Sequence, residues 1–137
     1  MNQTDTQADV VLEAIRFDAA GLVPAIAQQH DTGEVLMMAW MNADAVRETL
    51  LTGRVCYFSR SRDRLWRKGE SSGQTQHLKD FRIDCDGDTL LIQVEQIGAA
   101  CHEGYQSCFF RSVQNGGSSF KITEPQLVSP KQIYGKK

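Results

Sequence analysis

The stretch HLKDFRIDCDGDTLLIQVEQI, residues 77–97, decides the fold that we expect for this chain. Segments 77–84 and 89–97 flank Asp86 and Gly87, and an Asp-Gly pair between two strands favours a tight type I′ turn. Residues 89–95 also alternate between apolar and polar side chains, as a half-buried strand does. The stretch therefore predicts a β-hairpin.

A second hairpin is expected closer to the N-terminus. Residues 22–30 and 34–41 flank Asp-Thr-Gly, which is a turn signal between two strand-like segments. Asn42 then offers a helix N-cap, Asp44 falls in the first turn, and Gly53 closes the helix. This order of elements predicts two strands followed by one helix.

The middle of the chain adds another strand and a long loop. Residues 55–61, VCYFSRS, have the β-branched and aromatic composition of a strand, and residues 67–76 form a loop rich in glycine and serine. The chain is therefore mostly strands. We expect an α+β domain in which a strand-rich mixed sheet folds into a barrel-like core with one or two helices.

The composition bounds the class of protein. With 137 residues, 41% hydrophobic and 23% charged, residues 1–137 should form a single domain, with 1–8 and 128–137 as flexible tails. A net charge of −2 gives no reason to expect nucleic acid as a partner. The chain shows neither a membrane-spanning run nor a signal peptide, so we expect no membrane partner and a cytoplasmic location, where thiols persist.

Three aspartates lie at alternate positions, Asp84, Asp86 and Asp88. Alternate side chains of an extended chain share one face, and three carboxylates there repel one another unless a cation lies between them. Magnesium is the natural candidate, and a solvated acidic turn is the alternative. An EF-hand is excluded because Thr89 occupies the sixth position of the loop, which requires glycine.

Three of the four cysteines lie within residues 84–108, at Cys85, Cys101 and Cys108. Three protein ligands on zinc leave one position open, as in a catalytic site, where a bound water ionises near pH 7. A Cys101–Cys108 disulfide is the first alternative, although a reducing compartment disfavours it. His102 as a fourth ligand would instead close the site and make it structural. Cys56 is expected to be a buried small hydrophobe.

Residues 59–76 concentrate positive charge in an otherwise mildly acidic chain. Arginine side chains and backbone N–H groups suit phosphate, and an indole ring can stack on a base or sugar. A solvated surface loop is the alternative. We expect contacts with a phosphorylated substrate from Arg60, Arg62, Trp66, Lys68, Glu70, Ser71, Ser72 and Gly73.

Four motifs, LMMAWMN, YFSRSRDRLWRKGESSGQTQ, DCDGD and ACHEGYQSCF, closely resemble the phosphoribosyl-AMP cyclohydrolase family of histidine biosynthesis. The resemblance runs from about residue 16 to residue 111. It implies a hydrolase that opens the purine ring of 1-(5-phosphoribosyl)-AMP between N1 and C6, giving the formimino-carboxamide ribotide. One departure is Glu103, where many members carry threonine.

The resemblance also implies the cofactors and the quaternary state. Zinc would be held by Cys85, Cys101 and Cys108, and magnesium by the three aspartates. The family enzyme is a homodimer with one zinc per subunit, shared between the chains.

The expected mechanism uses zinc-activated hydroxide at C6, with magnesium assistance. A general acid must protonate the departing ring nitrogen, and His102 is the first candidate, with His77 the second. Zinc deaminases are disfavoured because the chain lacks their His-x-Glu and Pro-Cys-x-x-Cys patterns. The alternative from another class is a non-catalytic nucleotide-binding module whose zinc only staples the fold.

Overall fold

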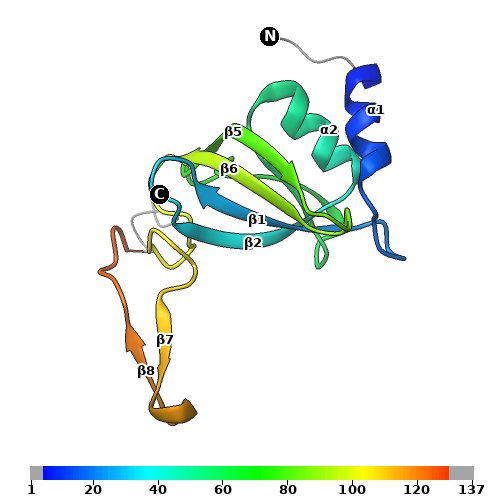
Figure 1. The fold of residues 1–137 in the computed structure, drawn as a ribbon. Coiled ribbons are helices and arrows are strands. Elements are labelled where there is room, and N and C mark those ends of the chain that lie inside the picture. The colour runs from blue at the N-terminus through cyan, green and yellow to red at the C-terminus, as the bar shows by residue number, and fades with distance from the viewer. Residues whose placement is uncertain (1–4, 130–137) are drawn as a thin grey trace.

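The computed structural model describes residues 5–129 of the chain (Figure 1). Its elements follow in the order α1 (Asp5–Ala14), β1 (Val23–Gln29), β2 (Val35–Met41), α2 (Ala43–Thr52), β3 (Cys56–Ser59), β4 (Arg64–Arg67), β5 (Gln76–Ile83), β6 (Leu90–Gln96), β7 (Arg111–Gln114), the 3₁₀-helix η1 (Asn115–Gly117) and β8 (Ser119–Ile122). No helix among residues 5–129 combines the length and the apolar character that crossing a bilayer requires.

Six strands form one mixed sheet in the order β4-β3-β2-β1-β6-β5. All neighbouring pairs are antiparallel except β1 and β6, which are parallel. The sheet curls (Figure 1), and its far sides meet at one end through a bridge between Arg54 and His77. Leu78 N–H donates to the Gly53 carbonyl at 2.8 Å at the same place. The α+β class is thus confirmed, with a half-barrel as its core.

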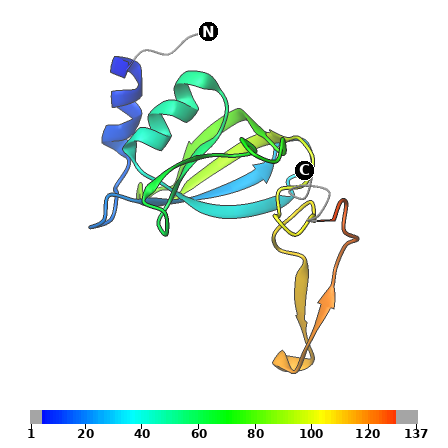
Figure 2. The same cartoon turned by 180° about the vertical axis from the view of Figure 1, so that it is seen from behind.

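The hydrophobic core lies between the two helices and one face of the sheet (Figures 1 and 2). Alternate side chains of the neighbouring strands β1 and β6 point inward, as the strand period requires. These fully buried residues are Val23, Ala25 and Ala27 of β1, and Leu90, Ile92 and Val94 of β6.

Both expected hairpins are confirmed, β1 with β2 and β5 with β6. The prediction of a type I′ turn between β5 and β6 is wrong. That turn needs positive φ at both central residues, whereas only Gly87 of the Asp-Gly pair is left-handed, with φ of 77°. The connection spans residues 84–89, and Gly87 N–H donates to the Asp84 carbonyl at 3.0 Å. A longer connection therefore replaces the two-residue turn.

Helix α2 begins and ends where the sequence predicts. Asn42 Oδ1 accepts a hydrogen bond from Ala45 N–H at 2.8 Å, which satisfies a free donor of the first turn. Gly53 takes the left-handed conformation with φ of 77°, and its N–H donates to the Thr49 carbonyl. The N-cap and the glycine C-cap are both confirmed.

Helix α1 occupies part of the segment expected to be an N-terminal tail. It begins at Asp5, and residues 1–4 lie outside the described part of the chain. Ala8 and Ile15 are buried, while Val11 and Leu12 pack against the core. These four positions repeat at helical spacing, which is the signal that the sequence contains for this helix.

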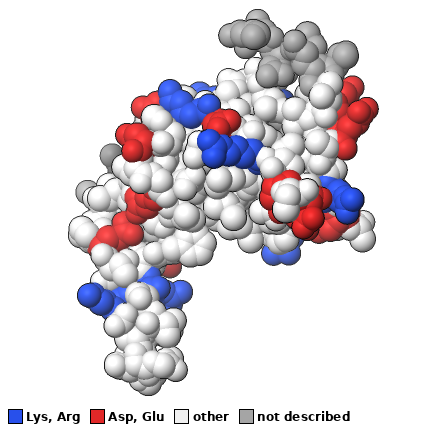
Figure 3. Space-filling model, viewed as in Figure 1, with Lys and Arg blue, Asp and Glu red and all other residues white. Residues whose placement is uncertain are grey.

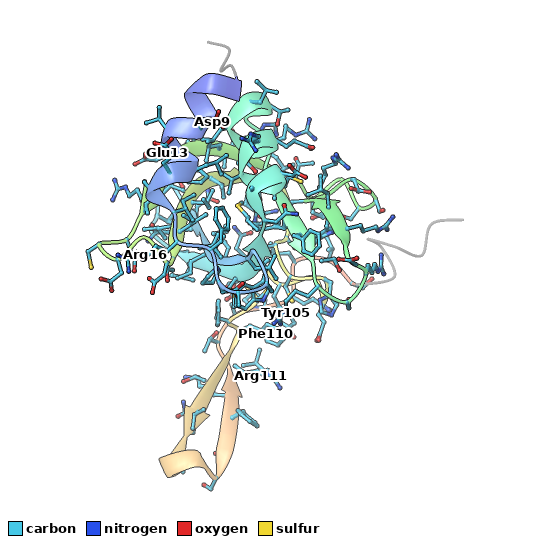
Figure 4. All side chains as sticks on the ribbon, turned by 90° about the vertical axis from the view of Figure 1, so that its right-hand side faces the viewer. Asp9, Glu13, Arg16, Tyr105, Phe110 and Arg111 are labelled. Carbon is cyan, nitrogen blue, oxygen red and sulfur yellow. The ribbon has the colours of Figure 1, made fainter. Side chains whose placement is uncertain are left out.

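The β7–β8 hairpin projects from the body of the molecule as a separate two-stranded ribbon (Figures 1 and 2). At its root the rings of Tyr105 and Phe110 stack with centroids 3.7 Å apart (Figure 4). The chain then returns to the body, where Leu127 and Val128 N–H groups donate to the Gly104 carbonyl at 2.8 and 3.2 Å. Val128, expected to begin the C-terminal tail, is therefore docked, and residues 130–137 lie outside the description.

Candidate active site

The three aspartates converge at the β5–β6 connection. Oxygen atoms of Asp84, Asp86 and Asp88 all lie within 4.8 Å of one another, and all three residues are exposed. Acidic side chains gather at this end of the sheet in Figure 3. The segment is a turn rather than the extended chain that the sequence argument assumed, so the turn itself brings the carboxylates together.

Local hydrogen bonds give the carboxyl groups of Asp84 and Asp88 different pKa values. Partial desolvation raises the pKa of Asp84, but hydrogen bonds from Asp88 and the N–H groups of Thr89 and Gly87 outweigh it and hold the pKa below its usual value. The pKa of Asp88 is raised, first by its hydrogen bond with Asp84 and then by the charges of Asp84 and Asp86. A bound cation would relieve this repulsion.

The connection is also fixed to helix α1. Arg16 N–H donates to the Gly87 carbonyl at 2.6 Å. A Cβ atom at residue 87 would lie 2.6 Å from the Ala14 carbonyl oxygen, so only glycine fits at this left-handed position. Figure 4 shows Arg16 at the end of α1. The acid cluster is therefore held by the body of the protein rather than by a free loop.

Cys101 and Cys108 lie together in the loop that follows β6. Burial, followed by the charge of the neighbouring Cys101 thiol and a hydrogen bond with it, raises the pKa of the Cys108 thiol to about 12. Glu103 N–H donates to Cys101 Sγ at 3.4 Å. All four cysteines of the chain are free thiols, so the alternative disulfide is not formed.

The rest of the protein fixes this loop tightly. Cys108 N–H donates to the Leu36 carbonyl of β2 at 2.6 Å, and Gly104 N–H donates to the Cys101 carbonyl at 2.9 Å. Gly104 is left-handed with φ of 94°, and a Cβ atom there would lie 1.7 Å from the Val128 carbonyl oxygen. The loop geometry therefore requires glycine at 104.

Cys85 does not join the thiol pair within one chain. It precedes β6 and Cys101 follows it, so the seven residues of that strand, at about 3.3 Å each, separate them by roughly 20 Å. Among the described residues, the acid cluster is the one group of three His, Cys, Asp or Glu side chains close enough to hold a metal. Cys85 is exposed, so its thiol is accessible to a second copy of the chain.

The donor sets fit the two expected metals differently. Three carboxylates are the hard oxygen ligands that magnesium prefers. Two adjacent thiols, one with an N–H···S hydrogen bond, fit zinc as a partial set that lacks its third protein ligand. The candidate metal ligands of one chain thus form one cluster of three carboxylates and a separate pair of thiols.

The two candidate general acids occupy different environments. His102 is exposed, and its Nε2 lies 3.9 Å from the Glu103 carboxylate. His77 is partly buried on β5, with its Nε2 3.5 Å from the Thr75 hydroxyl. Of the two, His102 directly follows a candidate zinc ligand and is open to a bound substrate.

An open cavity of about 870 Å³ lies over the β3–β4 hairpin. Of the predicted substrate contacts, it is lined by Arg60, Arg62, Trp66 and Glu70. Arg60 stacks over Trp40, with its guanidinium carbon 4.6 Å from the ring centroid. The cavity offers positive charge and aromatic surface together, which suits a phosphorylated nucleotide.

The remaining predicted contacts lie elsewhere. Lys68 is buried, and Ser72 Oγ accepts a hydrogen bond from Gln74 N–H at 3.2 Å. Ser71 is exposed, and Gly73 N–H donates to the Gly69 carbonyl at 2.8 Å. None of these four lines the cavity, so their contact with substrate stays a prediction.

The sequence argument missed two aromatic walls of the cavity, Trp40 and Phe58. They face each other across β2 and β3, where they are paired residues. Both are only partly buried in otherwise apolar strands. No local signal marks such positions, because strand alternation does not reveal which face borders a cavity.

Arg67 is withdrawn from the cavity by an ion pair. Its guanidinium donates to both carboxylate oxygens of Glu48 on α2, at 2.6 and 2.7 Å. The five cationic side chains within residues 59–76 therefore have three distinct environments. Arg67 is paired, Lys68 is buried, and Arg60, Arg62 and Arg64 line the cavity.

Comparison with known proteins shows which family this chain resembles. The family described as phosphoribosyl-AMP cyclohydrolase matches residues 37–110. A phosphoribosyl-AMP cyclohydrolase of Paramagnetospirillum magneticum is 62% identical over 99% of this chain and 100% of its own length. One of Granulibacter bethesdensis is 62% identical over 91% of this chain and 97% of its own. One of Acidiphilium cryptum is 68% identical over 78% and 92%.

Proposed function

Because the chain belongs to the phosphoribosyl-AMP cyclohydrolase family, whose enzymes hydrolyse a cyclic amidine bond, we propose that it opens the purine ring of 1-(5-phosphoribosyl)-AMP in histidine biosynthesis. Water adds at C6, the C6–N1 bond breaks, and N1 takes a proton. The product is the formimino-carboxamide ribotide.

The observation that carries this proposal is the proximity of the cavity to the loop that holds the thiol pair. Trp66 lines the cavity, and the Lys68 ammonium lies 5.8 Å from the centroid of its ring. Lys68 in turn reaches the loop of Cys101 and Cys108. The cavity and the thiol loop are therefore neighbours, with Trp66 and Lys68 between them.

Cys101 and Cys108 are proposed to hold zinc together with Cys85 of the partner subunit. Zinc bound there would supply activation of a water molecule near neutral pH. Glu103 N–H donates to Cys101 Sγ, and Cys108 N–H donates to the Leu36 carbonyl, which fixes the thiol loop against β2. These contacts orient the ligands before any metal arrives.

The acid cluster is proposed to hold magnesium. Magnesium there would neutralise phosphate charge. Since Cys85 lies between Asp84 and Asp86, a homodimer that brings Cys85 to the partner's thiol pair also brings its acid cluster to that site. One active site would then draw residues from both chains, and the separation of Cys85 from Cys101 supports this arrangement.

His102 is proposed to donate the proton to the departing N1. Its ring is exposed beside the thiol loop, and histidine titrates in the range where a proton donor is useful near neutral pH. The Glu103 carboxylate lies 3.9 Å from the Nε2 of His102. His77 remains the second candidate.

A direct assay tests the proposed function. Purified protein, loaded with zinc and supplied with magnesium, should convert 1-(5-phosphoribosyl)-AMP, and the change in ultraviolet absorbance as the purine ring opens reports the turnover. Removal of both metals with a chelator should stop the reaction, and their return should restore it. Binding of the substrate without turnover under these conditions would instead favour a zinc-stapled nucleotide-binding module.

A further inference from the structure

Lys68 places an ammonium group inside the protein. The residue follows β4 directly, and its N–H donates to the Val55 carbonyl at 3.1 Å, which turns its side chain away from solvent. Only 9% of its surface is exposed. Its Nζ donates to the Ala100 carbonyl at 2.8 Å, one residue before Cys101.

A buried ammonium needs a compensating negative charge. Among the ion pairs of the described residues, none involves Lys68. Burial lowers the pKa of Lys68, and the charges of the Cys108 and Cys101 thiols oppose this shift. The sulfur pair is therefore the negative partner of this side chain, and the Ala100 carbonyl accepts its hydrogen bond.

The surroundings separate Lys68 from the substrate cavity. Lys68 does not line the cavity, whereas the indole ring of Trp66, 5.8 Å from its Nζ, does. The ammonium is therefore directed toward the loop behind the indole rather than toward a phosphate in the cavity. Gln74 anchors the same loop from another point, because its Oε1 accepts from Ala99 N–H at 2.6 Å.

We propose that Lys68 is a positioning residue of the metal site: its buried ammonium offsets the negative charge of the metal-bound thiolates and fixes their loop through Ala100. The proposal rests on the proposed function only in that the two thiols hold zinc. Three thiolates and one Zn²⁺ carry a net charge of −1, which one ammonium cancels. Groups that orient and neutralise metal ligands in this way typically change metal affinity by about 10–100-fold.

The test measures zinc affinity rather than activity. Wild type and variants are equilibrated with a competing chelator at graded concentrations, and bound zinc per subunit is measured. Lys68→Met should weaken zinc binding by about 10–100-fold. Lys79→Met, the same change at an exposed lysine of β5, is the matched control and should retain wild-type affinity.

Two further variants separate charge from packing. Lys68→Gln keeps a donor for the Ala100 carbonyl but removes the charge, so it should also lose affinity. Lys68→Arg keeps the charge and should recover most of the affinity that Lys68→Gln loses. If Lys68→Met does not fold, the comparison of Lys68→Gln with Lys68→Arg decides the question in the same way.

The outcomes distinguish this proposal from the proposed function. Wild-type protein that binds zinc, together with Lys68→Gln of unchanged zinc affinity, would overturn the role of Lys68 alone. Wild-type protein that binds no zinc would overturn the metal assignment and, with it, the role of Lys68. Equal losses in Lys68→Gln and Lys68→Arg would also overturn it, because the charge would then have no part.

Discussion

Thr49 and Cys56 exchange two hydrogen bonds that join helix α2 to strand β3. Cys56 N–H donates to Thr49 Oγ1 at 2.9 Å, and the Thr49 hydroxyl donates to the Cys56 carbonyl at 3.3 Å. Both residues are fully buried. The Cys56 thiol is therefore held in the core, in agreement with its expected role as a small hydrophobe.

The first prediction follows from this buried thiol. Burial, followed by the charge of Glu48, raises the pKa of Cys56 from 9.0 to about 11. Because the folded state keeps the proton longer than the unfolded state, stability present below pH 9 should be lost as the pH rises toward 11. The contribution is about 3 kcal/mol in the free energy of unfolding.

Denaturant unfolding between pH 8 and pH 11 measures this effect as the difference between wild type and Cys56→Ala. Other groups titrate in this range, so only the difference between the two proteins reports Cys56. Parallel pH profiles for both proteins would show that the thiol contributes nothing to the alkaline loss of stability.

The second prediction concerns zinc. Cys101→Ser and Cys108→Ser should each lose bound zinc and nearly all activity, because serine is a poor zinc ligand and the pair is adjacent in the structure. Metal content per subunit and turnover are the measurements. Cys56→Ala, a thiol away from the site, is the control and should keep its zinc. Full turnover of either serine variant in the presence of chelator would end the zinc mechanism.

The third prediction concerns magnesium. Asp86→Asn should weaken the response of the reaction to added Mg²⁺ while leaving zinc in place, because it removes one of three converging carboxylates. Asp80→Asn alters an exposed aspartate of β5 outside the cluster and serves as the control. Identical Mg²⁺ titrations for Asp86→Asn and wild type would reduce the cluster to an acidic turn.

The fourth prediction concerns His102. His102→Ala should keep its zinc and its dimer but lose turnover by about 10²–10⁴-fold, as expected for a missing proton donor. Substrate binding, measured separately by titration, should be largely intact. Loss of zinc in this variant would identify His102 as a fourth ligand and favour the structural zinc site. Near-normal turnover would transfer the proton-donor role to His77 or solvent.

The fifth prediction concerns the homodimer and the ribbon formed by β7 and β8. Val113 and Phe120 are 63% and 66% exposed, and they face each other across the two strands. Exposed apolar side chains on a projecting element are typical of an interaction surface. Wild type should therefore sediment as a dimer, and Phe120→Ser should dissociate more readily.

The neighbouring variant Lys121→Ser is the control, because Lys121 lies on the same strand with the opposite side-chain direction. Removal of zinc should also loosen the dimer, since Cys85 of the partner subunit is its proposed third ligand. A stable and active wild-type monomer at working concentration would contradict the shared site.

Local signals explain which parts of the fold the sequence predicts. Asn42 and Gly53 act on their own helix, and the turn residues act on their own hairpins, so α2 and both hairpins are predictable. Ala8 and Ile15 carry the spacing of α1, but the polar residues around them made the segment resemble a tail. The parallel pairing of β1 with β6 has no local signal at all.

The candidate site shows the same division. The three aspartates are close in sequence, so one turn is enough to gather them. Cys85 and Cys101 are also close in sequence, yet strand β6 separates them, because an extended segment maximises the distance between its ends. The burial of Lys68 depends on contacts with Val55 and Ala100, which lie elsewhere in the chain. The composition of residues 59–76 therefore could not predict that Lys68 is buried.

The parallel pair of β1 and β6 has a consequence for how the protein folds. It joins two units that are each antiparallel, β1 to β4 and β5 with β6, and its register places Ala25 opposite Leu90. Hairpins form in about 1–10 μs, whereas pairing between distant segments must first close a long loop and is slower. The same late step brings Cys108 to Leu36 of β2. We therefore expect the thiol loop to reach its place on β2 only after the parallel pair has formed.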